Sequence, residues 1–326
     1  MRRLAFLLWI FAIFFVPRST WATDEFLPGV KRILVLGDSI TYAGQYVADF
    51  ELFLLARYPE RKFEVINLGL PSETVSGLSE EGHADGKFPR PDLHERLDRA
   101  LPKIKPDLVL ACYGMNDGIY LPLDEGRFAK FREGMQWLHD KVQVSGAKII
   151  HLTPPTYHPL KDRNEFVSGG THAYMLVGYN LVLDRYSEWL LAQRAQGWQV
   201  IDLHGPMNAF LKEKWMSQPD FIFAKDGVHP NDEGHALLAD ELIKGLAPAD
   251  FPAWQKYRAD LAANPQGGAV TKLARQHSRI LCDAWLNDVG HQRPGMAKGL
   301  PVAEAEAQAA ALEKQLAAIL PAWPRL

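Results

Sequence analysis

The chain has little cysteine, and it lacks the short patterns of metal, glycan and nucleotide sites. Its only cysteines are Cys112 and Cys282, too few for a disulfide scaffold, and the sequence leaves open whether they are bridged. No C-x-x-C, H-E-x-x-H, N-x-Ser/Thr, G-x-G-x-x-G or Walker pattern occurs at a suitable place. We therefore expect no metal and no cofactor.

An excess of positive charge is also missing. Lysine and arginine number 36 against 39 aspartates and glutamates, for a net charge of −3, and no basic cluster stands out. Nucleic-acid binding would require such a cluster to neutralise phosphates. We expect no nucleic-acid partner.

Long apolar runs are absent except at the N-terminus. Met1-Arg2-Arg3 is followed by the apolar run 4–16, by Pro17, and by Thr20-Trp21-Ala22 with small residues at both ends. This pattern predicts a signal peptide, residues 1–22, cleaved after Ala22. An uncleaved anchor is the alternative, but the run is shorter than the ~20 residues that cross a bilayer. We expect a secreted or periplasmic protein with no stable membrane insertion after cleavage.

Short apolar segments alternate with amphipathic ones along the rest of the chain. The strand candidates are 32–36, 63–67, 107–112, 148–152 and 199–202, and the helix candidates are 45–57, 93–104, 127–144, 173–194 and 232–246. Strands that read as continuous apolar runs are typical of a parallel sheet covered on both faces. The alternation predicts an α/β fold.

The character of the chain changes after Leu246. Pro248, Pro252, Pro265 and the Gly267-Gly268 pair interrupt the sequence, and two further helical segments follow. We expect a main domain over residues 23–247 and a C-terminal helical extension over 248–326 that packs on it.

A serine stands where the first predicted strand ends. In Gly37-Asp38-Ser39 the glycine permits a sharp turn, and open α/β sheets place their sites at the carboxyl ends of strands. The same residues are also ordinary turn formers. Ser39 is a nucleophile only if a base lies close to it, because a serine hydroxyl is weakly nucleophilic by itself.

A base and its orienting group occur together near the last helix of the main domain. Asp226 and His229 are three residues apart, so the carboxylate can bind the imidazole of its own turn and fix its tautomer.

Two further strand ends carry possible hydrogen-bond donors for an oxyanion. Gly69 offers a backbone N–H and Asn116 a side-chain amide, although each also suits a simple turn.

Taken together, these blocks resemble the SGNH/GDSL hydrolase superfamily. The matching residues are Gly37-Asp38-Ser39, the glycine of Asn67-Leu68-Gly69, Gly114-Met115-Asn116-Asp117 and Asp226-Gly227-Val228-His229-Pro230. They span about residues 31–246. One departure is Ser72, where many relatives carry a second glycine.

The resemblance implies a flavodoxin-like three-layer α/β/α sandwich with about five parallel strands and the activity of a serine esterase. Ser39 would be the nucleophile, His229 the base and Asp226 its orienting group. The oxyanion hole would consist of the N–H groups of Ser39 and Gly69 and the side chain of Asn116. The α/β-hydrolase alternative lacks its G-x-S-x-G motif.

The substrate is less well determined by the sequence. We expect a short-chain ester, above all acetyl, on a small molecule or a polysaccharide, with Asp38, Asp117 and Tyr157 near it and the segment 153–174 facing it. Tyr120, Tyr157 and Trp215 are expected to be exposed aromatics. The alternatives are a lysophospholipase- or thioesterase-type acylhydrolase and a non-catalytic glycan-binding protein on the same scaffold.

Overall fold

The computed structural model describes residues 26–159 and 178–324. The predicted signal peptide therefore lies outside the described residues, as does most of the segment expected to face the substrate. The strands are β1 (Arg32–Gly37), β2 (Glu64–Asn67), β3 (Leu108–Cys112), β4 (Lys148–Leu152) and β5 (Gln199–Ile201).

The helices, in chain order, follow the strands as an α/β fold requires. They are α1 (Ser39–Ala43), α2 (Gln45–Arg57), α3 (Leu97–Ile104), α4 (Glu125–Val144), α5 (Tyr179–Ala192), α6 (His204–Ser217), α7 (Asp232–Leu246), α8 (Phe251–Ala263), α9 (Gly267–Val289) and α10 (Val302–Ile319). Short 3₁₀ turns are η1 (His83–Gly86), η2 (Leu93–Glu95) and η4 (Gln193–Gln196).

The five strands form one parallel sheet in the order β2-β1-β3-β4-β5. The chain runs from β1 to β2 in one direction and from β3 to β5 in the other. Right-handed crossovers therefore place α2 on one face and α3, α4 and α5 on the opposite face. The predicted three-layer α/β/α sandwich is confirmed, and its reversal point lies between β1 and β3.

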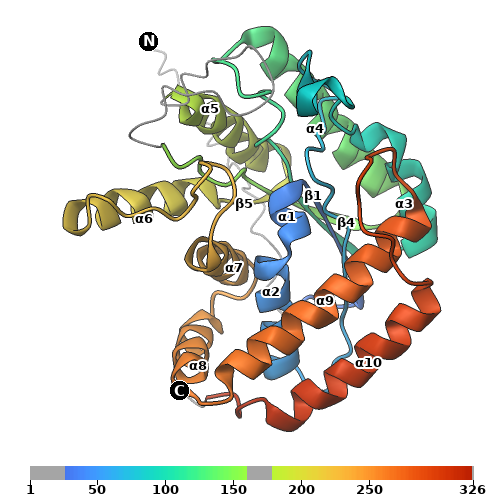
Figure 1. The fold of residues 1–326 in the computed structure, drawn as a ribbon, viewed down its shortest axis with the longest axis vertical. Coiled ribbons are helices and arrows are strands. Elements are labelled where there is room, and N and C mark those ends of the chain that lie inside the picture. The colour runs from blue at the N-terminus through green and yellow to red at the C-terminus, as the bar shows by residue number, and fades with distance from the viewer. Residues whose placement is uncertain (1–25, 160–177, 325–326) are drawn as a thin grey trace, which may run out of the picture.

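Each face of the sheet has its own helical layer. Figure 1 shows α2 between α7 and α9, and α2 packs against both. In the opposite layer, Phe131 of α4 stacks on Tyr186 of α5 with ring centroids 4.1 Å apart, and Lys141 of α4 pairs with Asp98 of α3. Every residue of β3 is buried between these layers, which explains its uninterrupted apolar sequence.

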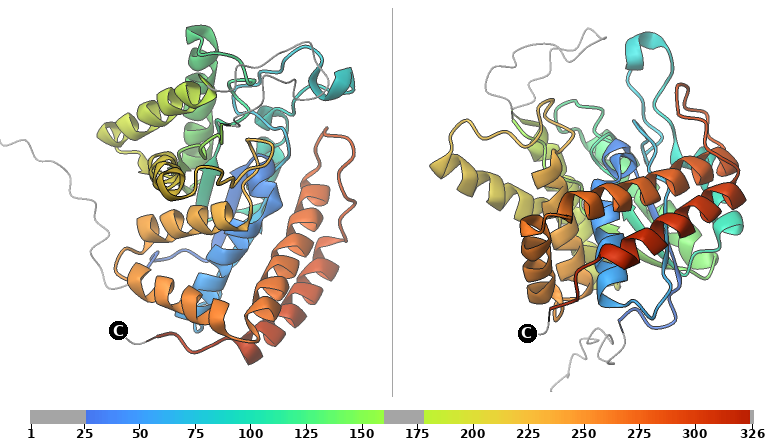
Figure 2. Two further views of the ribbon diagram at one scale, coloured as in Figure 1. Left: turned by 60° about the vertical axis from the view of Figure 1, so that its left-hand side comes forward. Right: turned by 60° about the horizontal axis from the view of Figure 1, so that its bottom comes forward.

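The helices that follow Leu246 contact earlier parts of the chain. Helices α9 and α10 lie side by side in all views of Figures 1 and 2, and α9 packs against both α2 and β2. Arg279 of α9 donates to the carbonyl oxygens of Tyr42 and Ala43, and Arg293 donates to that of Pro71. The extension therefore holds α1, which begins at Ser39, and the loop after β2.

The structure contains helices that the sequence analysis did not assign. Helix α8 begins next to Pro252, which is compatible with a first helical turn because its missing N–H has no helical partner there. Helix α6 buries only His204, Met207 and Leu211, too few residues for a clear helical pattern.

Both cysteines are buried free thiols. Within the described ranges, no helix is long and apolar enough to cross a membrane.

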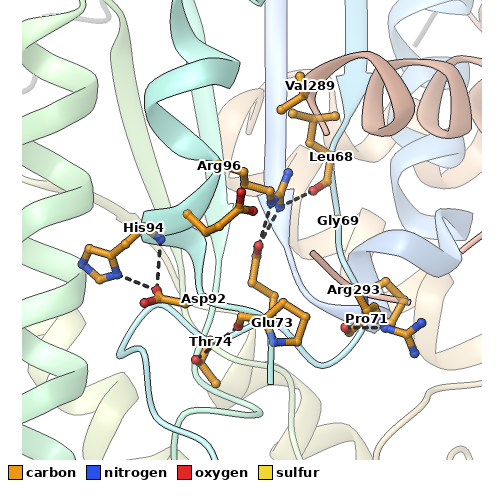
Figure 3. A network of polar contacts seen from close by, with 12 residues as sticks. Leu68, Gly69, Pro71, Glu73, Thr74, Asp92, His94, Arg96, Val289 and Arg293 are labelled. Atoms are coloured by element: carbon orange, nitrogen blue, oxygen red, sulfur yellow. Dashed lines mark hydrogen bonds and ion pairs between the residues drawn. The ribbon is translucent and has the colours of Figure 1, made fainter. Parts of the chain in front are cut away.

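A buried ion pair holds the loop after β2 (Figure 3). Arg96 makes two bonds of 2.6 Å to the carboxylate of Glu73 and donates to the carbonyl oxygen of Leu68 at 2.7 Å. The hydroxyl of Tyr113 donates to the same carboxylate at 2.7 Å. Glu73 and Arg96 are both fully buried, so each charge depends on the other. This pair fixes the path of the chain from Leu68 to Glu73.

Replacing Arg96 by methionine should leave the carboxylate of Glu73 buried without its partner. We expect the free energy of unfolding to fall by about 3–5 kcal/mol, measured by urea denaturation. The double variant with Glu73→Gln should recover part of this loss, because the unpaired charge is gone. Lys256→Met, which removes an exposed pair with Asp260, is the control and should cost less than ~1 kcal/mol. An equally small cost for Arg96→Met would contradict the role of the pair.

Candidate active site

Ser39 is the first residue of α1, directly beyond β1. The carboxylate of Asp38 caps this helix by accepting from the N–H of Ile40 at 2.9 Å. The N–H of Ser39 belongs to the first turn, where backbone donors have no partner inside the helix. The serine thus presents a hydroxyl and a backbone N–H together at the carboxyl edge of the sheet.

The structure brings Ser39, His229 and Asp226 into a continuous chain of contacts. The Nε2 atom of His229 lies 2.7 Å from the Oγ of Ser39, although 190 residues separate them. The Nδ1 atom of His229 lies 2.6 Å from Oδ2 of Asp226. The other carboxylate oxygen of Asp226 accepts from the N–H groups of Val228 and His229. An imidazole held in this way can accept the serine proton.

The electrostatics of the Asp226–His229 pair favour a charged carboxylate next to a basic imidazole. Partial burial acts against ionisation of Asp226, but hydrogen bonds from the ring and the backbone of His229 hold the pKa of Asp226 well below its usual value. The hydrogen bond that the imidazole donates to Asp226 raises the pKa of His229, although partial burial opposes the shift. The side chains of His229 and Asp226 are 48% and 46% exposed, so a substrate can approach them.

Tyr157 supports the turn that carries Asp226 and His229. Gly227 has φ +88, and a Cβ there would lie 2.3 Å from the hydroxyl of Tyr157. The N–H of His158 donates to the carbonyl oxygen of Gly227 at 2.8 Å. Tyr157 is fully buried, so the expectation of an exposed aromatic that contacts substrate is wrong. The other two expected aromatics, Tyr120 and Trp215, are partly buried.

Gly69 is engaged in a structural contact in this structure. Its N–H donates to Oδ1 of Asn67 at 2.8 Å, and Nδ2 of Asn67 donates to the carbonyl oxygen of Thr41 at 2.7 Å. A Cβ at position 69 would lie 2.3 Å from the backbone nitrogen of Tyr42. Glycine is required here because the loop lies against α1. The expected role of this N–H as an oxyanion donor gains no support from its geometry.

Ser72 is a residue whose backbone the sequence analysis did not consider as a donor. It has φ +70, a conformation that favours glycine, and its N–H has no acceptor among residues 26–159 and 178–324. The resemblance described above offered a signal, since it implies a glycine where this chain has Ser72. A non-glycine residue in the left-handed region stores strain of about 1–3 kcal/mol.

Asn116 follows β3, the neighbour of β1, and its side chain is buried. Its Oδ1 accepts from Nη1 of Arg90 at 2.9 Å and from the hydroxyl of Tyr120 at 3.1 Å. Its Nδ2 donates to the carbonyl oxygen of Glu73 at 3.2 Å. Sequence reasoning missed Arg90, which carries no motif and reaches this loop only through the fold.

Two aspartates expected near the substrate are instead inside the protein. Asp38 caps α1, and Oδ1 of Asp117 accepts from the N–H groups of Val75 and Ser76 at 2.9 and 2.8 Å. Burial raises the pKa of each carboxyl to about 6. Their contacts are structural, and a direct contact with substrate is not supported.

In the part of the chain that the structure describes, no group of side chains is arranged to hold a metal ion.

Comparisons with known proteins identify a matching sequence family and a shared fold. The sequence profile of the GDSL-like Lipase/Acylhydrolase family matches residues 35–237. No curated protein sequence matches the chain. The fold is similar to that of a gut microbial diltiazem-metabolizing enzyme, with 22% identity and a TM-score of 0.55. That match covers 67% of this chain and 48% of the other, so the chain spans about half its length.

The second similar structure is a catalytic mutant of Axe2, an acetylxylan esterase from Geobacillus stearothermophilus. The identity is 21% and the TM-score 0.50, and the match covers 67% of this chain and 94% of the other. At these identities, the similarity to the two structures establishes a shared fold and nothing more. The evidence for the family is the sequence profile that matches residues 35–237.

The raised pKa of His229 can be measured directly. In an NMR titration of the imidazole resonances we expect a midpoint above the usual value of ~6.5, because the ionised Asp226 stabilises the imidazolium. In Asp226→Asn the midpoint should move to lower pH, since the first cause of the shift is removed. The resonances of His94, which pairs with Asp92 elsewhere, provide the control. An unchanged midpoint in Asp226→Asn would contradict this description of the pair.

Proposed function

The chain belongs to the GDSL-like lipase/acylhydrolase family and is a carboxylic ester hydrolase, and we propose that it is a secreted serine esterase for short-chain, above all acetyl, esters. The observation that carries the proposal is the contact of 2.7 Å between Nε2 of His229 and Oγ of Ser39, with Asp226 behind the imidazole. These are the distances over which a proton can pass from nucleophile to base.

The proposed reaction has two steps. His229 accepts the proton of Ser39 while the serine oxygen attacks the ester carbonyl, and the imidazolium then protonates the leaving alcohol. Water enters next and gives its proton to His229 as it attacks the acyl-enzyme, which releases the acid and the free serine. Asp226 stays ionised throughout, because its pKa is held well below its usual range, and it stabilises the imidazolium.

The tetrahedral intermediate needs hydrogen-bond donors for its negative oxygen. The N–H of Ser39 and the remaining side-chain N–H of Asn116 are suited to this role, since neither is used by the contacts described above. Gly69 was expected to supply a third donor, but its N–H is bonded to Asn67. The N–H of Ser72, which lies three residues further along the same loop, takes its place in our proposal.

A carbohydrate is the alcohol that we propose for the substrate. His229, which would protonate the leaving alcohol, is half exposed, so a bulky polar alcohol can reach it. The fold is shared with an acetylxylan esterase, and this likeness supports an acetylated polysaccharide or oligosaccharide. Export of the protein is supported by the predicted signal peptide with cleavage after Ala22.

The proposed nucleophile can be tested by covalent labelling. A serine-directed phosphonate should inactivate the enzyme and modify Ser39, as read by mass spectrometry of peptides, while Ser39→Ala should be neither labelled nor active. On nitrophenyl esters we expect kcat/KM to fall from acetyl to longer acyl chains, and acetylated xylo-oligosaccharides should release acetate. Ser145→Ala, on the surface after α4, is the control and should keep full activity.

The outcomes of this test separate the alternatives. A preference for long acyl chains would favour a lysophospholipase- or thioesterase-type acylhydrolase. Binding of glycans without phosphonate labelling or acetate release would favour a non-catalytic binding protein and end the proposal of an esterase mechanism.

The proposed oxyanion hole gives a second test. Asn116→Ala should lower kcat by about 10²–10³, because one donor to the developing negative charge is lost, with a much smaller effect on KM. The effect is measured by steady-state kinetics on nitrophenyl acetate. A kcat close to that of the wild type would remove Asn116 from the mechanism.

A further inference from the structure

Among residues 26–159 and 178–324, partners are found for every hydrogen-bonding position of the Asn116 side chain except one N–H. An asparagine amide carries two N–H donors and a carbonyl oxygen with two lone pairs. Arg90 and Tyr120 donate to both lone pairs of Oδ1, and one N–H donates to the carbonyl oxygen of Glu73. Arginine has donors only, so the atom that faces Arg90 must be the oxygen. The orientation of the amide is therefore determined by its partners.

We propose that Arg90 is a positioning residue that, together with Tyr120, fixes the Asn116 amide so that its one open N–H faces the developing oxyanion. The inference rests on the proposed function, since it concerns a donor of the proposed oxyanion hole. No substrate contact is assigned to Arg90, which acts through Asn116.

Arg90 is itself held rigidly. Its Nε and Nη2 atoms each lie 2.6 Å from an oxygen of the Glu80 carboxylate, and only 8% of the residue is exposed. Burial opposes ionisation of Glu80, but hydrogen bonds from His83 and Arg90 lower its pKa to about 2. The ion pair therefore persists at any pH at which the enzyme would work. A bidentate pair of this kind restricts the guanidinium to one position, from which Nη1 reaches Asn116.

Tyr120 reaches Asn116 through a strained turn. Ile119 and Tyr120 have φ +46 and +55, and a β-branched residue in the left-handed region is an outlier. This turn brings the hydroxyl of Tyr120 back to a side chain four residues earlier. The ring of Tyr120 stacks on that of Tyr179, with the ring centroids 5.0 Å apart. The guanidinium carbon of Arg90 lies over the ring of Tyr120, 5.2 Å from its centroid. Strain that is held in place by surrounding contacts is found most often at functional sites.

The charge of Arg90 also affects the strength of the open N–H. A guanidinium at the amide oxygen draws electron density away from the nitrogen, so its N–H becomes a better donor to an anion. Without Arg90, the amide can rotate by half a turn and present Oδ1 to the oxyanion, which repels it. Loss of Arg90 should therefore impair the transition state more than the binding of substrate.

A double-mutant cycle between Arg90 and Asn116 tests the proposal. With nitrophenyl acetate, we expect Arg90→Ala to lower kcat by about 10–10²-fold and to leave KM within about twofold, since it weakens one oxyanion donor. In the Asn116→Ala background, Arg90→Ala should have almost no further effect, because the group through which it acts is gone. Tyr120→Phe should show a smaller loss of kcat with the same lack of additivity.

Chemical rescue separates positioning from a general loss of structure. Guanidinium at concentrations that do not denature the protein should raise the kcat of Arg90→Ala and should not raise that of the double variant. If Arg90→Ala does not fold, Arg90→Lys keeps a positive charge without the bidentate pair, and it should show the same dependence on Asn116.

The control is Arg32→Ala, because Arg32 also pairs with a glutamate and donates to a carbonyl oxygen, but at the amino end of β1. It should keep the wild-type kcat.

The results that would overturn the proposal are distinct from those that overturn the esterase mechanism. Arg90→Ala could lower kcat by the same factor in the wild type and in the Asn116→Ala background. That result, or a change in KM alone, would show that Arg90 acts on the substrate or on the fold and not through Asn116. The side-chain NH₂ resonances of Asn116 give a readout that needs no activity, and they should shift in Arg90→Ala. An unchanged NH₂ pair would overturn the positioning role even in an active esterase, whereas an unlabelled Ser39 would overturn the mechanism itself.

Discussion

The pairing of β1 with β3 is the constraint on which the whole site depends. Gly37 is paired with Cys112, so the two strands end at the same level of the sheet. The sheet reverses its direction of growth between these strands, and crossover helices leave on opposite faces. In open α/β sheets, ligands bind at the carboxyl ends of the strands that flank such a reversal. Ser39 follows one strand and Asn116 the other, and neither could be placed in this way by local structure alone.

Near these strand ends, polar groups of the protein hold one another. Asn67 satisfies the N–H of Gly69 and the carbonyl oxygen of Thr41, which joins the loop after β2 to α1. The buried pair of Glu73 and Arg96 holds the same loop through the carbonyl oxygen of Leu68 (Figure 3). Because buried donors and acceptors are costly to leave unpaired, an N–H such as that of Ser72, which has no acceptor among the described residues, stands out. We propose that the oxyanion uses donors of this kind, since it can bond to them without displacing a contact of the fold.

The C-terminal extension takes part in the same arrangement. Arg279 binds the end of α1 and Tyr42 bonds to Asp283, while Arg293 binds the loop after β2 at Pro71. These contacts join segments more than 200 residues apart in the sequence. The extension covers the edge strand β2 with α9, as an exposed edge requires, and at the same time supports the two segments that carry Ser39 and Ser72.

Local sequence patterns are sufficient to predict the fold class, the order of the strands along the chain, and the short-range pair of Asp226 and His229. These follow from local rules, since apolar runs form buried strands and a carboxylate three residues before a histidine can bind it within one turn. The contact of His229 with Ser39, the burial of Tyr157 and Asp117, and the reach of Arg90 to Asn116 follow from the packing of the folded chain. They depend on residues from different loops or strand ends, whose distances local patterns do not set. The bond between Gly69 and Asn67 is local, but its geometry too is fixed by the close approach of this loop to α1. Sequence patterns record which residues can make hydrogen bonds, whereas the packing of the sheet and its helices selects the partner.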